Sequence, residues 1–266
     1  MRSSPVHITS RANPRWRAAR DLHRRQTRRS ASRFLVDGAS MIAAAVGGGV
    51  TLKELWLCSE MGADPKAWHA YDALVFTVPP SLFTQLAYRR HPDGHLAVAE
   101  VFSVDLERLD LDGAGLVLVV DGTEKPGNLG AMMRTAEAFA VDAVIASDTR
   151  TDLFNPNVLR ASMGALFRIP VAAAGAAAVR AALQAAELRI VPTSRRGARS
   201  LWDVDLTQRV AIVVGSEDRG LGSEWSPGGP ASVTIPTPGG GNPLNVSVAT
   251  ALALAEAVRQ RRSIVH

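Results

Sequence analysis

Three polar loops in the second half of the chain hold the residues best suited to chemistry. They span residues 121–130, 215–220 and 236–247, and each follows a short apolar run of the kind found in buried strands. The carboxyl ends of parallel strands meet at one edge of a sheet, where open α/β sheets bind their ligands. We therefore expect the polar side chains of these loops to meet at one ligand site.

Several familiar catalytic sites are excluded by the sequence. It contains neither a phosphate-binding G-x-x-x-x-G-K-[ST] loop nor a G-x-G-x-x-G turn that opens a helix after the first strand. Gly215-Ser216-Glu217 lacks the nucleophile-elbow pattern, and only His266 follows His95, which excludes a Ser-His-Asp triad in the second half. His91 and His95 have no third ligand close in sequence, so we expect no metal site. The single Cys58 excludes an intramolecular disulfide and favours a reducing compartment.

Hydrophobic periodicity predicts an α/β fold in two parts. From Gly115 onwards, apolar runs alternate strictly with helical stretches, which predicts a mostly parallel, doubly wound sheet. The part before it reads as a smaller α/β unit. The predicted strands cover 34–36, 52–58, 74–78, 96–102, 116–120, 143–146, 189–192, 210–214 and 232–235. The predicted helices cover 40–46, 63–74, 81–89, 129–139, 172–186 and 246–262.

Positive charge is concentrated near the N-terminus. The net charge is +5, yet residues 1–33 hold ten arginines against one acidic residue, Asp21, which leaves the remainder mildly acidic. A basic segment of this kind points to a polyanion, and to nucleic acid first. The alternative is a solubilising tail or an Arg-rich targeting peptide. We expect a basic arm at 1–33, a small α/β domain at 34–104, an acid-rich linker at 105–114 and the sheet domain at 115–266.

Composition and hydropathy narrow the class of protein. Hydrophobic residues make up 47% of the chain, which is enough to bury a core and excludes a disordered or collagen-like protein. No apolar segment of signal-peptide length follows the basic arm, and the alanine-rich runs are broken before the ~20 residues needed to span a bilayer. The sequence therefore predicts a soluble cytoplasmic protein.

Five segments of the chain carry recognisable motifs. They are Asn128–Ala136, Gly215–Gly220, Ile235-Pro236 with Leu244–Ala249, then Arg160–Ala165, and finally Phe34–Gly38. The first three, in the three loops, resemble the ordered motifs of the SpoU/TrmH family of RNA ribose 2'-O-methyltransferases in the SPOUT superfamily. The fourth resembles the family's R-A-S-x-G-A motif, and the fifth resembles the start of its ribosomal-protein-like substrate-binding domain. The resemblance therefore covers nearly the whole chain.

The resemblance implies an S-adenosylmethionine-dependent enzyme that acts as a homodimer and whose catalytic domain contains a C-terminal trefoil knot. By position in the motifs, Thr193, Gly215, Ile235 and Leu244 are the expected cofactor contacts. The chemistry agrees with this assignment, because an adenine and a sulfonium need a tight apolar slot with backbone hydrogen bonds, and glycine permits close backbone approach. No metal is implied.

The same motifs place Arg134, Asn128, Glu217 and Asn245 at the catalytic site. Family accounts make the equivalent of Arg134 the residue that activates the 2'-hydroxyl, although a guanidinium is effectively always protonated in proteins. We hypothesise that Arg134 binds phosphate and orients the hydroxyl, with Glu217 and Asn128 fixing the guanidinium. Asn128 and Asn245 also suit helix N-caps, and Glu217 can be read as a solvated loop acid. An arginine early in the predicted helix 129–139 opposes the helix dipole, which argues against a purely structural role.

RNA contacts are expected from Arg24, Arg25, Arg28 and Arg29 in the basic arm, and from Arg160, which alternatively crosses the dimer interface. Ribosomal RNA is the expected substrate and transfer RNA the alternative. The basic arm and Phe34–Val36 also resemble actinobacterial enzymes that methylate 23S ribosomal RNA and confer antibiotic resistance.

One position departs from the family pattern. The third motif commonly reads Ser-Leu-Asn, whereas this chain has Pro243-Leu244-Asn245, so any step that needs the serine hydroxyl is in doubt. Asn242 or Ser247 are candidates to compensate for it. A non-catalytic RNA-binding protein is therefore a second hypothesis. A small-molecule methyltransferase is disfavoured by the basic arm and by the substrate-domain resemblance.

Overall fold

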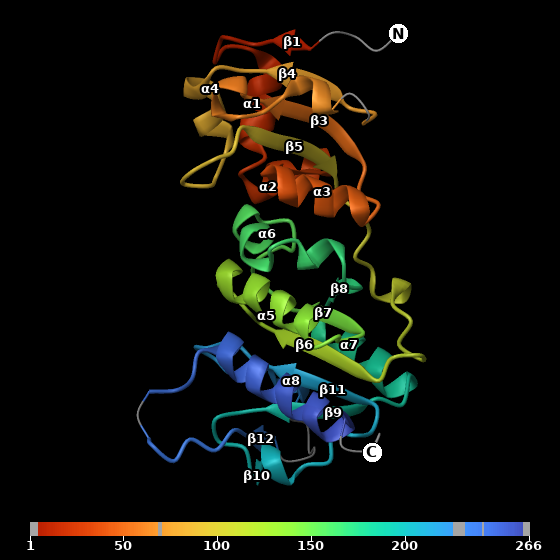
Figure 1. The fold of residues 1–266 in the computed structure, drawn as a ribbon. Helices are drawn as coiled ribbons and strands as arrows, with labels where there is room; N and C mark the ends of the chain where they lie inside the picture. The colour runs from red at the N-terminus through yellow and green to blue at the C-terminus, as the bar shows by residue number, and fades with distance from the viewer. Residues whose placement is uncertain (1–4, 69–70, 226–231, 241, 263–266) are drawn as a thin grey trace. The chain divides into compact units, whose positions relative to one another are not determined.

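The computed structural model describes residues 5–68, 71–225, 232–240 and 242–262. It has an α/β fold that divides into two compact units (Figure 1). The first unit takes Met1–Ser103 together with Phe154–Arg168, and the second takes Val104–Leu153 together with Ile169–His266. No helix among the described residues is both long and apolar enough to cross a membrane.

The first unit is built on a five-stranded mixed sheet in the order β1-β4-β3-β5-β2. β1 and β3 run parallel to β4, and β5 runs antiparallel to both β3 and β2. The strands are β1 (Val6–His7), β2 (Arg33–Asp37), β3 (Leu52–Leu57), β4 (Leu74–Thr77) and β5 (His95–Glu100). The helices are α1 (Pro14–Asp21), α2 (Arg25–Ala31), α3 (Ala39–Gly47), α4 (Pro80–Leu86) and α6 (Pro156–Ser162), with 3-10 turns at Ser59–Met61, Pro65–Trp68 and Ala165–Phe167.

The predicted basic arm is folded rather than separate. Asn13 caps α1 by accepting hydrogen bonds from the backbone of Arg15 and Trp16, and Pro14 occupies the first helical position. Trp16 and Leu22 are buried in the core of the first unit, where the Trp16 indole N–H donates to a backbone carbonyl of α4. The boundary at residue 33 was therefore wrong, because apolar side chains spaced between the arginines complete this core.

Arg28 was predicted to bind RNA, and the structure contradicts this. Its side chain is buried, with 3% of the residue exposed. Its guanidinium donates to the backbone carbonyls of Leu22 at 2.9 Å and His23 at 2.8 Å, just after α1 ends. Carbonyls at the end of a helix lack intrahelical partners. Arg28 thus closes the C-terminus of α1 and is not available to a phosphate.

Residues 154–168 belong to the first unit although they lie inside the stretch predicted as the sheet domain. The Phe154 ring lies 4.9 Å from that of Phe34 and 5.0 Å from that of Phe102, and the Phe167 ring stacks on Phe34 at 6.3 Å. Such aromatic clusters contribute to core stability beyond the area that they bury. The predicted sheet domain at 115–266 therefore does not form one continuous segment, since the first unit uses two separate parts of the chain.

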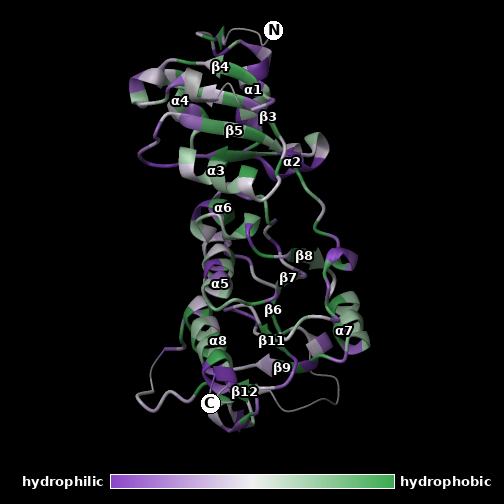
Figure 2. Cartoon of the chain, turned by 45° about the vertical axis from the view of Figure 1, so that its right-hand side comes forward, coloured by the Kyte–Doolittle hydropathy of each residue, from purple (hydrophilic) through white to green (hydrophobic). Residues whose placement is uncertain are grey.

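The second unit contains a seven-stranded sheet in the order β10-β12-β9-β11-β6-β7-β8. Every described pairing in it is parallel, and α7 lies on the opposite face from α5 and α8 (Figure 2). This confirms the predicted doubly wound sheet. Its strands are β6 (Leu116–Asp121), β7 (Ala143–Ser147), β8 (Val171–Ala174), β9 (Arg189–Thr193), β10 (Arg199–Ser200), β11 (Val210–Val214) and β12 (Val233–Thr234). Its helices are α5 (Pro126–Ala138), α7 (Ala176–Ala185) and α8 (Val246–Arg262), with 3-10 turns at Leu106–Arg108, Leu201–Asp203 and Ser223–Trp225.

The last turns of α8 are anchored to the sheet by side-chain hydrogen bonds to backbone. Arg261 donates to the carbonyls of Gly115, Leu206 and Gln208, and burial lowers the pKa of its guanidinium. Gln260 accepts from the Leu206 N–H at 2.8 Å. These hydrogen bonds fix the C-terminal turns of α8. Because the helix is rigid, they also help to fix its N-terminal turns, which contain the end of the third motif.

Several element predictions were wrong in detail. The predicted linker at 105–114 is part of the second unit, where Leu111 and Ala114 are buried in the core. The described residues of 63–74 form a 3-10 turn and bends rather than an α-helix, and residues 69–70 lie outside the description. The predicted helix 172–186 is a strand, β8, followed by α7. In this alanine-rich sequence, the two-residue repeat of a strand cannot be told from the 3.6-residue repeat of a helix.

Candidate functional site

A cavity of about 800 Å³ lies in the second unit, at the carboxyl ends of β9, β11 and β12. Its wall comes from three segments: the end of β9 with the residues after it, the loop after β11, and the loop that joins β12 to α8. Small-molecule and cofactor cavities typically occupy ~300–1,000 Å³. The loops 215–220 and 236–247 therefore meet as predicted, and they meet around a cavity of cofactor size.

All four predicted cofactor contacts line this cavity. Thr193 closes β9, Gly215 follows β11, Ile235 follows β12, and Leu244 lies two residues before α8. The Thr193 hydroxyl donates to the Val213 carbonyl at 3.0 Å, which ties the ends of β9 and β11 together. The structure thus brings together residues that lie far apart in the sequence.

The loop after β11 is held in a tight reversal. Ser216 and Gly220 exchange two backbone hydrogen bonds of 2.9 Å, and the Arg219 N–H donates to the Ser216 hydroxyl. A Cβ on Gly215 would overlap the carbonyl carbon of Gly220 and would lie 2.5 Å from its oxygen. Only glycine fits where two backbones approach this closely. The reversal sets the position of Glu217 at its turn.

Asp121 fastens this reversal to the neighbouring strand β6. One carboxylate oxygen accepts from the Ser147 hydroxyl at 3.0 Å and the other from the Gly222 N–H at 2.8 Å. The residue is almost fully buried at the end of β6. Because the chain continues directly into the 121–130 loop, Asp121 joins the first and second polar loops. This role was not predicted from the sequence, although an acidic residue that ends an otherwise apolar run was a signal for it.

Replacing Asp121 with alanine is expected to weaken both cofactor binding and folding, since the buried Ser147 hydroxyl loses its partner at a cost of about 1–3 kcal/mol and the part-buried Gly222 N–H loses the contact that holds the reversal. Asp121→Asn is the matched control, because the amide oxygen can still accept from Gly222 and the amide N–H can donate to the Ser147 hydroxyl. We expect the alanine variant to bind S-adenosylmethionine about tenfold more weakly by calorimetry and the asparagine variant to stay close to wild type. Equal affinities for both variants would contradict this positioning role.

The first and third loops meet through two asparagines. The Asn245 side chain accepts from the Ser247 N–H at 2.8 Å and so caps α8, as one of the two readings predicted. Its Nδ2 also donates to Asn128 Oδ1 at 3.4 Å. Asn128 is not an N-cap, because α5 begins at Pro126 after Lys125. The helix therefore presents Asn128 from its first turn toward the third loop.

Two polar atoms at this site are buried and lack a hydrogen-bond partner. They are Glu217 Oε1 and Asn128 Nδ2. Buried polar groups in native proteins nearly always find partners, and an exception calls for an explanation such as a missing ligand or water. Glu217 lines the cavity and Asn128 contacts a residue that does. One unused acceptor and one unused donor fit a site that is completed by a polar ligand, and Glu217 is not a solvated loop acid.

Arg134 lies on the exposed surface of α5 and does not line the cavity. In the described part of the chain, no hydrogen bond or ion pair joins it to Glu217 or Asn128, so the predicted clamp on the guanidinium is not formed. Since α5 begins at Pro126, Arg134 lies in the second half of the helix, and the argument from an unfavourable dipole no longer applies. Its guanidinium faces solvent, where a large anionic substrate can reach it.

The other predicted RNA contacts lie in the first unit. Arg24, Arg25 and Arg29 are exposed around α2, and Arg160 is exposed on α6. No cluster of three or more His, Cys, Asp or Glu side chains that could hold a metal ion occurs among residues 5–68, 71–225, 232–240 and 242–262.

Two family matches cover most of the chain. The SpoU rRNA Methylase family matches residues 115–255, and the MRM3-like substrate binding domain matches residues 13–97. The second match begins in α1, in agreement with the packing of the predicted arm into the first unit.

Individual relatives agree with these matches. The chain is 31% identical over 260 residues to a 23S rRNA (uridine(2479)-2'-O)-methyltransferase of Streptomyces viridochromogenes, an alignment that covers 93% of this chain and 89% of the relative. The crystal structure of the SpoU methyltransferase AviRb from the same organism, in complex with AdoMet, has a TM-score of 0.87 at 27% identity and covers 94% of this chain and 99% of that chain. An RNA 2'-O ribose methyltransferase structure has a TM-score of 0.82 at 36% identity and covers 97% of this chain and 100% of that chain. The chain is therefore a member of the SpoU rRNA methylase family.

Proposed function

We propose that this protein methylates a ribose 2'-hydroxyl in 23S ribosomal RNA, with S-adenosylmethionine as the methyl donor. The observation that carries the proposal is the cavity at the ends of β9, β11 and β12, which every predicted cofactor contact lines. The names of the relatives and the AdoMet in the AviRb crystal structure support both the substrate and the cofactor. A cytoplasmic location follows from this substrate.

The residues of the site have separate roles in the proposed reaction. The bound cofactor supplies an electrophilic methyl group, and transfer to a ribose needs the hydroxyl held in line with it. Thr193, Gly215, Ile235 and Leu244 hold the cofactor, and Glu217 and Asn128 offer a polar acceptor and donor at its edge. Arg134 binds an RNA phosphate and orients the hydroxyl from the exposed face of α5. Asn245 positions Asn128 while it caps α8.

Methyl transfer itself tests the proposal. The full chain is incubated with methyl-tritiated S-adenosylmethionine and either unmodified 23S ribosomal RNA or transfer RNA, and the product is digested to nucleosides. We expect label in one 2'-O-methylnucleoside of the 23S RNA and a matching primer-extension stop at low nucleotide concentration. Label in transfer RNA alone would favour the alternative substrate. Cofactor binding by calorimetry with no methyl transfer to either RNA would leave a non-catalytic binding protein and would overturn the proposal.

Pro243 is the one observation in favour of that second candidate. It lines the cavity and is exposed at the position where the family commonly has serine. The neighbouring Asn242 and the amide of Asn245 leave polar groups at this corner, so we propose that the chain is active without the serine hydroxyl. Restoring a serine with Pro243→Ser is a direct comparison in the same assay.

RNA binding is proposed for the first unit. Exposed arginines on α1 and α2, among them Arg17, Arg24 and Arg29, form a basic surface on the domain that matches a substrate binding family. Phosphate contacts of this type give affinity that falls steeply with salt. Arg160 on α6 adds to the basic residues of the same unit. A role in antibiotic resistance, predicted from the resemblance to actinobacterial enzymes, stays a prediction.

We also propose that the protein is a homodimer and that the segment from β12 to α8 forms the trefoil knot of the family. Val248 and Leu252 are exposed apolar residues one helical turn apart on α8, and Leu244 is exposed just before it. An apolar stripe at this spacing suits helix packing against a second copy.

Changing Val248 and Leu252 together to aspartate is expected to convert a dimer to a monomer, because it places charge in the apolar interface. Light scattering coupled to size exclusion measures the mass. Trp202→Asp is the matched control, since Trp202 is an exposed apolar residue elsewhere in the second unit. A wild-type monomer, or a double variant that retains the dimer mass, would contradict the proposed interface.

A further inference from the structure

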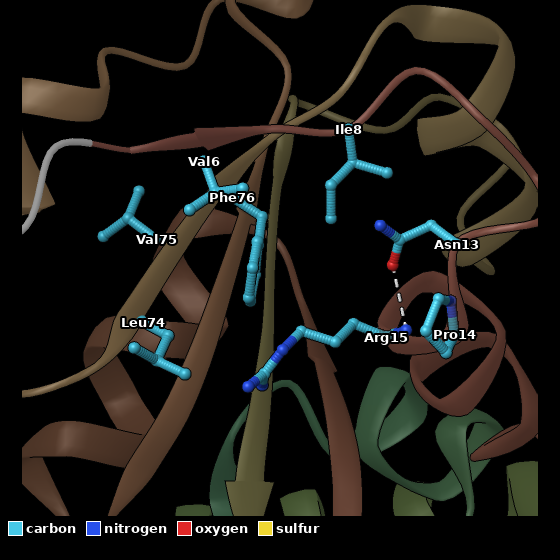
Figure 3. A pocket seen from close by; sticks show the side chains of 8 residues that line it. All are labelled: Val6, Ile8, Asn13, Pro14, Arg15, Leu74, Val75 and Phe76. Carbon is cyan, nitrogen blue, oxygen red and sulfur yellow. Dashed lines mark hydrogen bonds between the residues drawn. The ribbon is translucent and has the colours of Figure 1, made fainter.

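A second hollow, in the first unit, has no part in the proposed methyl transfer. It measures about 310 Å³ and lies between the edge strand β1, strand β4 and the start of α1. Figure 3 shows the side chains of Ile8, Asn13, Arg15 and Phe76 around it. From its size, lining and charge, we propose that this hollow binds an unstacked nucleobase of the RNA substrate. The inference rests on the proposed function, because it assumes that the substrate is RNA.

The lining of the hollow is mainly apolar, and two of its residues are unusually exposed. Val6 is 53% and Leu74 is 45% exposed, whereas Ile8 and Phe76 behind them are buried. Single exposed apolar residues are common, but these lie together beside a basic helix. A flat, uncharged ring that enters the hollow would cover them and would leave the phosphates outside.

Arg15 provides a flat, partly preorganised surface at the edge of the hollow. Its guanidinium carbon lies 5.6 Å from the centroid of the Phe76 ring, and Nη1 lies 3.3 Å from a carboxylate oxygen of Glu54. More than half of the Arg15 side chain remains exposed in spite of these contacts. Unstacked bases in protein–RNA complexes stack on guanidinium planes as well as on aromatic rings. Arg15 is thus held in one place with a surface free to stack.

Asn13 adds a hydrogen-bond donor in a fixed orientation. Its Oδ1 accepts from the backbone of Arg15 and Trp16 as the N-cap of α1, which fixes the plane of the amide. No hydrogen bond joins its Nδ2 to another residue in the described part of the chain, and in Figure 3 this nitrogen is directed toward the hollow. Every nucleobase has ring nitrogen or carbonyl acceptors on its edge that such a donor can meet.

The charge around the hollow favours RNA over an apolar peptide as the occupant. Arg11, Arg17 and Arg20 are exposed on or beside α1. Arg20 is paired with Asp21, while Arg17 donates to the uncharged backbone carbonyl of Arg11. A nucleobase in the hollow would bring the flanking phosphates to this basic helix. Stacking and phosphate contacts then act together.

The test separates contact with a base from contact with the backbone. The full chain is titrated with a fluorescein-labelled 12-nucleotide single-stranded RNA and with the same RNA carrying three central abasic sites. We expect the abasic RNA to bind about tenfold more weakly to the wild type, as loss of a stacked base predicts. The intact RNA with 4-thiouridine at the central positions should crosslink to residues within 5–16 or 71–77 when peptides are mapped by mass spectrometry.

Two arginine variants give a matched comparison on one helix. Arg15→Ala and Arg17→Ala remove the same charge, yet only Arg15 lines the hollow. We expect Arg17→Ala to weaken binding of both RNAs about twofold and to keep their tenfold ratio, whereas Arg15→Ala reduces that ratio to nearly one. Leu74→Gln, at an exposed position, repeats the test without touching the Glu54 ion pair and should also lower the ratio.

The possible outcomes are distinguishable from failure of the proposed function. If 23S RNA is methylated but the intact and abasic RNAs bind equally, or crosslinks fall only elsewhere, the base site is wrong and the methyltransferase proposal stands. If the two arginine variants behave alike, the hollow contributes charge only, and the base site is again wrong. If neither RNA binds and no RNA is methylated, the proposed function fails together with the inference.

Discussion

Gly215→Ala is expected to weaken cofactor binding while the protein stays folded. The added Cβ would overlap the backbone of Gly220 and would push apart the two strands of the reversal that carries Glu217. Overpacking of this kind costs about 1–3 kcal/mol, which corresponds to roughly 5- to 150-fold in affinity when the strain falls on the binding site. Calorimetric titration with S-adenosylmethionine measures the loss.

Gly239→Ala provides the control for this variant. A Cβ at Gly239 meets nothing within 4 Å, although the residue lies in the loop between β12 and α8. We expect its cofactor affinity to match that of the wild type, and circular dichroism to give similar unfolding temperatures for all three proteins. Wild-type affinity in Gly215→Ala would mean that the loop after β11 does not form the cofactor wall.

Arg134→Ala should abolish methyl transfer and leave cofactor binding intact. Arg134 is exposed on α5 and lies outside the cavity lining, so the cofactor does not depend on it. Removing one group that stabilises charge only in the transition state lowers kcat by about 100- to 1,000-fold, as the loss of a single oxyanion-hole donor does. Arg134→Lys keeps the charge but loses the two parallel hydrogen bonds of the guanidinium, and we expect it to recover only a small part of the rate.

The control for Arg134 is Arg189→Ala. Arg189 is an exposed arginine of the same unit at the amino end of β9, on the edge of the sheet opposite the cavity. Its loss should leave both kcat and cofactor affinity unchanged. Near-normal turnover by Arg134→Lys would contradict bidentate orientation, and loss of cofactor affinity in Arg134→Ala would place Arg134 in the binding site instead.

The meeting of the polar loops could be predicted from the sequence because they follow the strands of a regular sheet. Apolar runs such as 116–120 and 210–214 became β6 and β11, and topology alone then brings the loops after them to one edge. The helix 246–262 was predicted with its observed bounds. What the sequence did not contain is the cross-chain tie from Asp121 to Gly222, which depends on two strands lying side by side.

The first unit was harder to predict because charged residues stand between the apolar residues that form its core. Trp16, Ala19 and Leu22 are spaced as on one helix face, yet arginines between them suggested a solvated arm. Arg28 is an arginine among other arginines, as an RNA contact would be. Only the folded structure shows that its guanidinium donates to the carbonyls after α1. The roles of Asn128 and Glu217 could be expected from motifs, but their unpartnered atoms are properties of the folded site.

The two-part construction of the first unit has a consequence during synthesis on the ribosome. The main core of the first unit comes from residues 8–98, but Phe154 and Phe167 pack on Phe34 and Phe102, so this aromatic cluster cannot form until both have been translated. By then β6, α5 and β7 of the second unit have also been translated. The aromatic cluster of the first unit is therefore completed only after part of the sheet of the second unit has been synthesised.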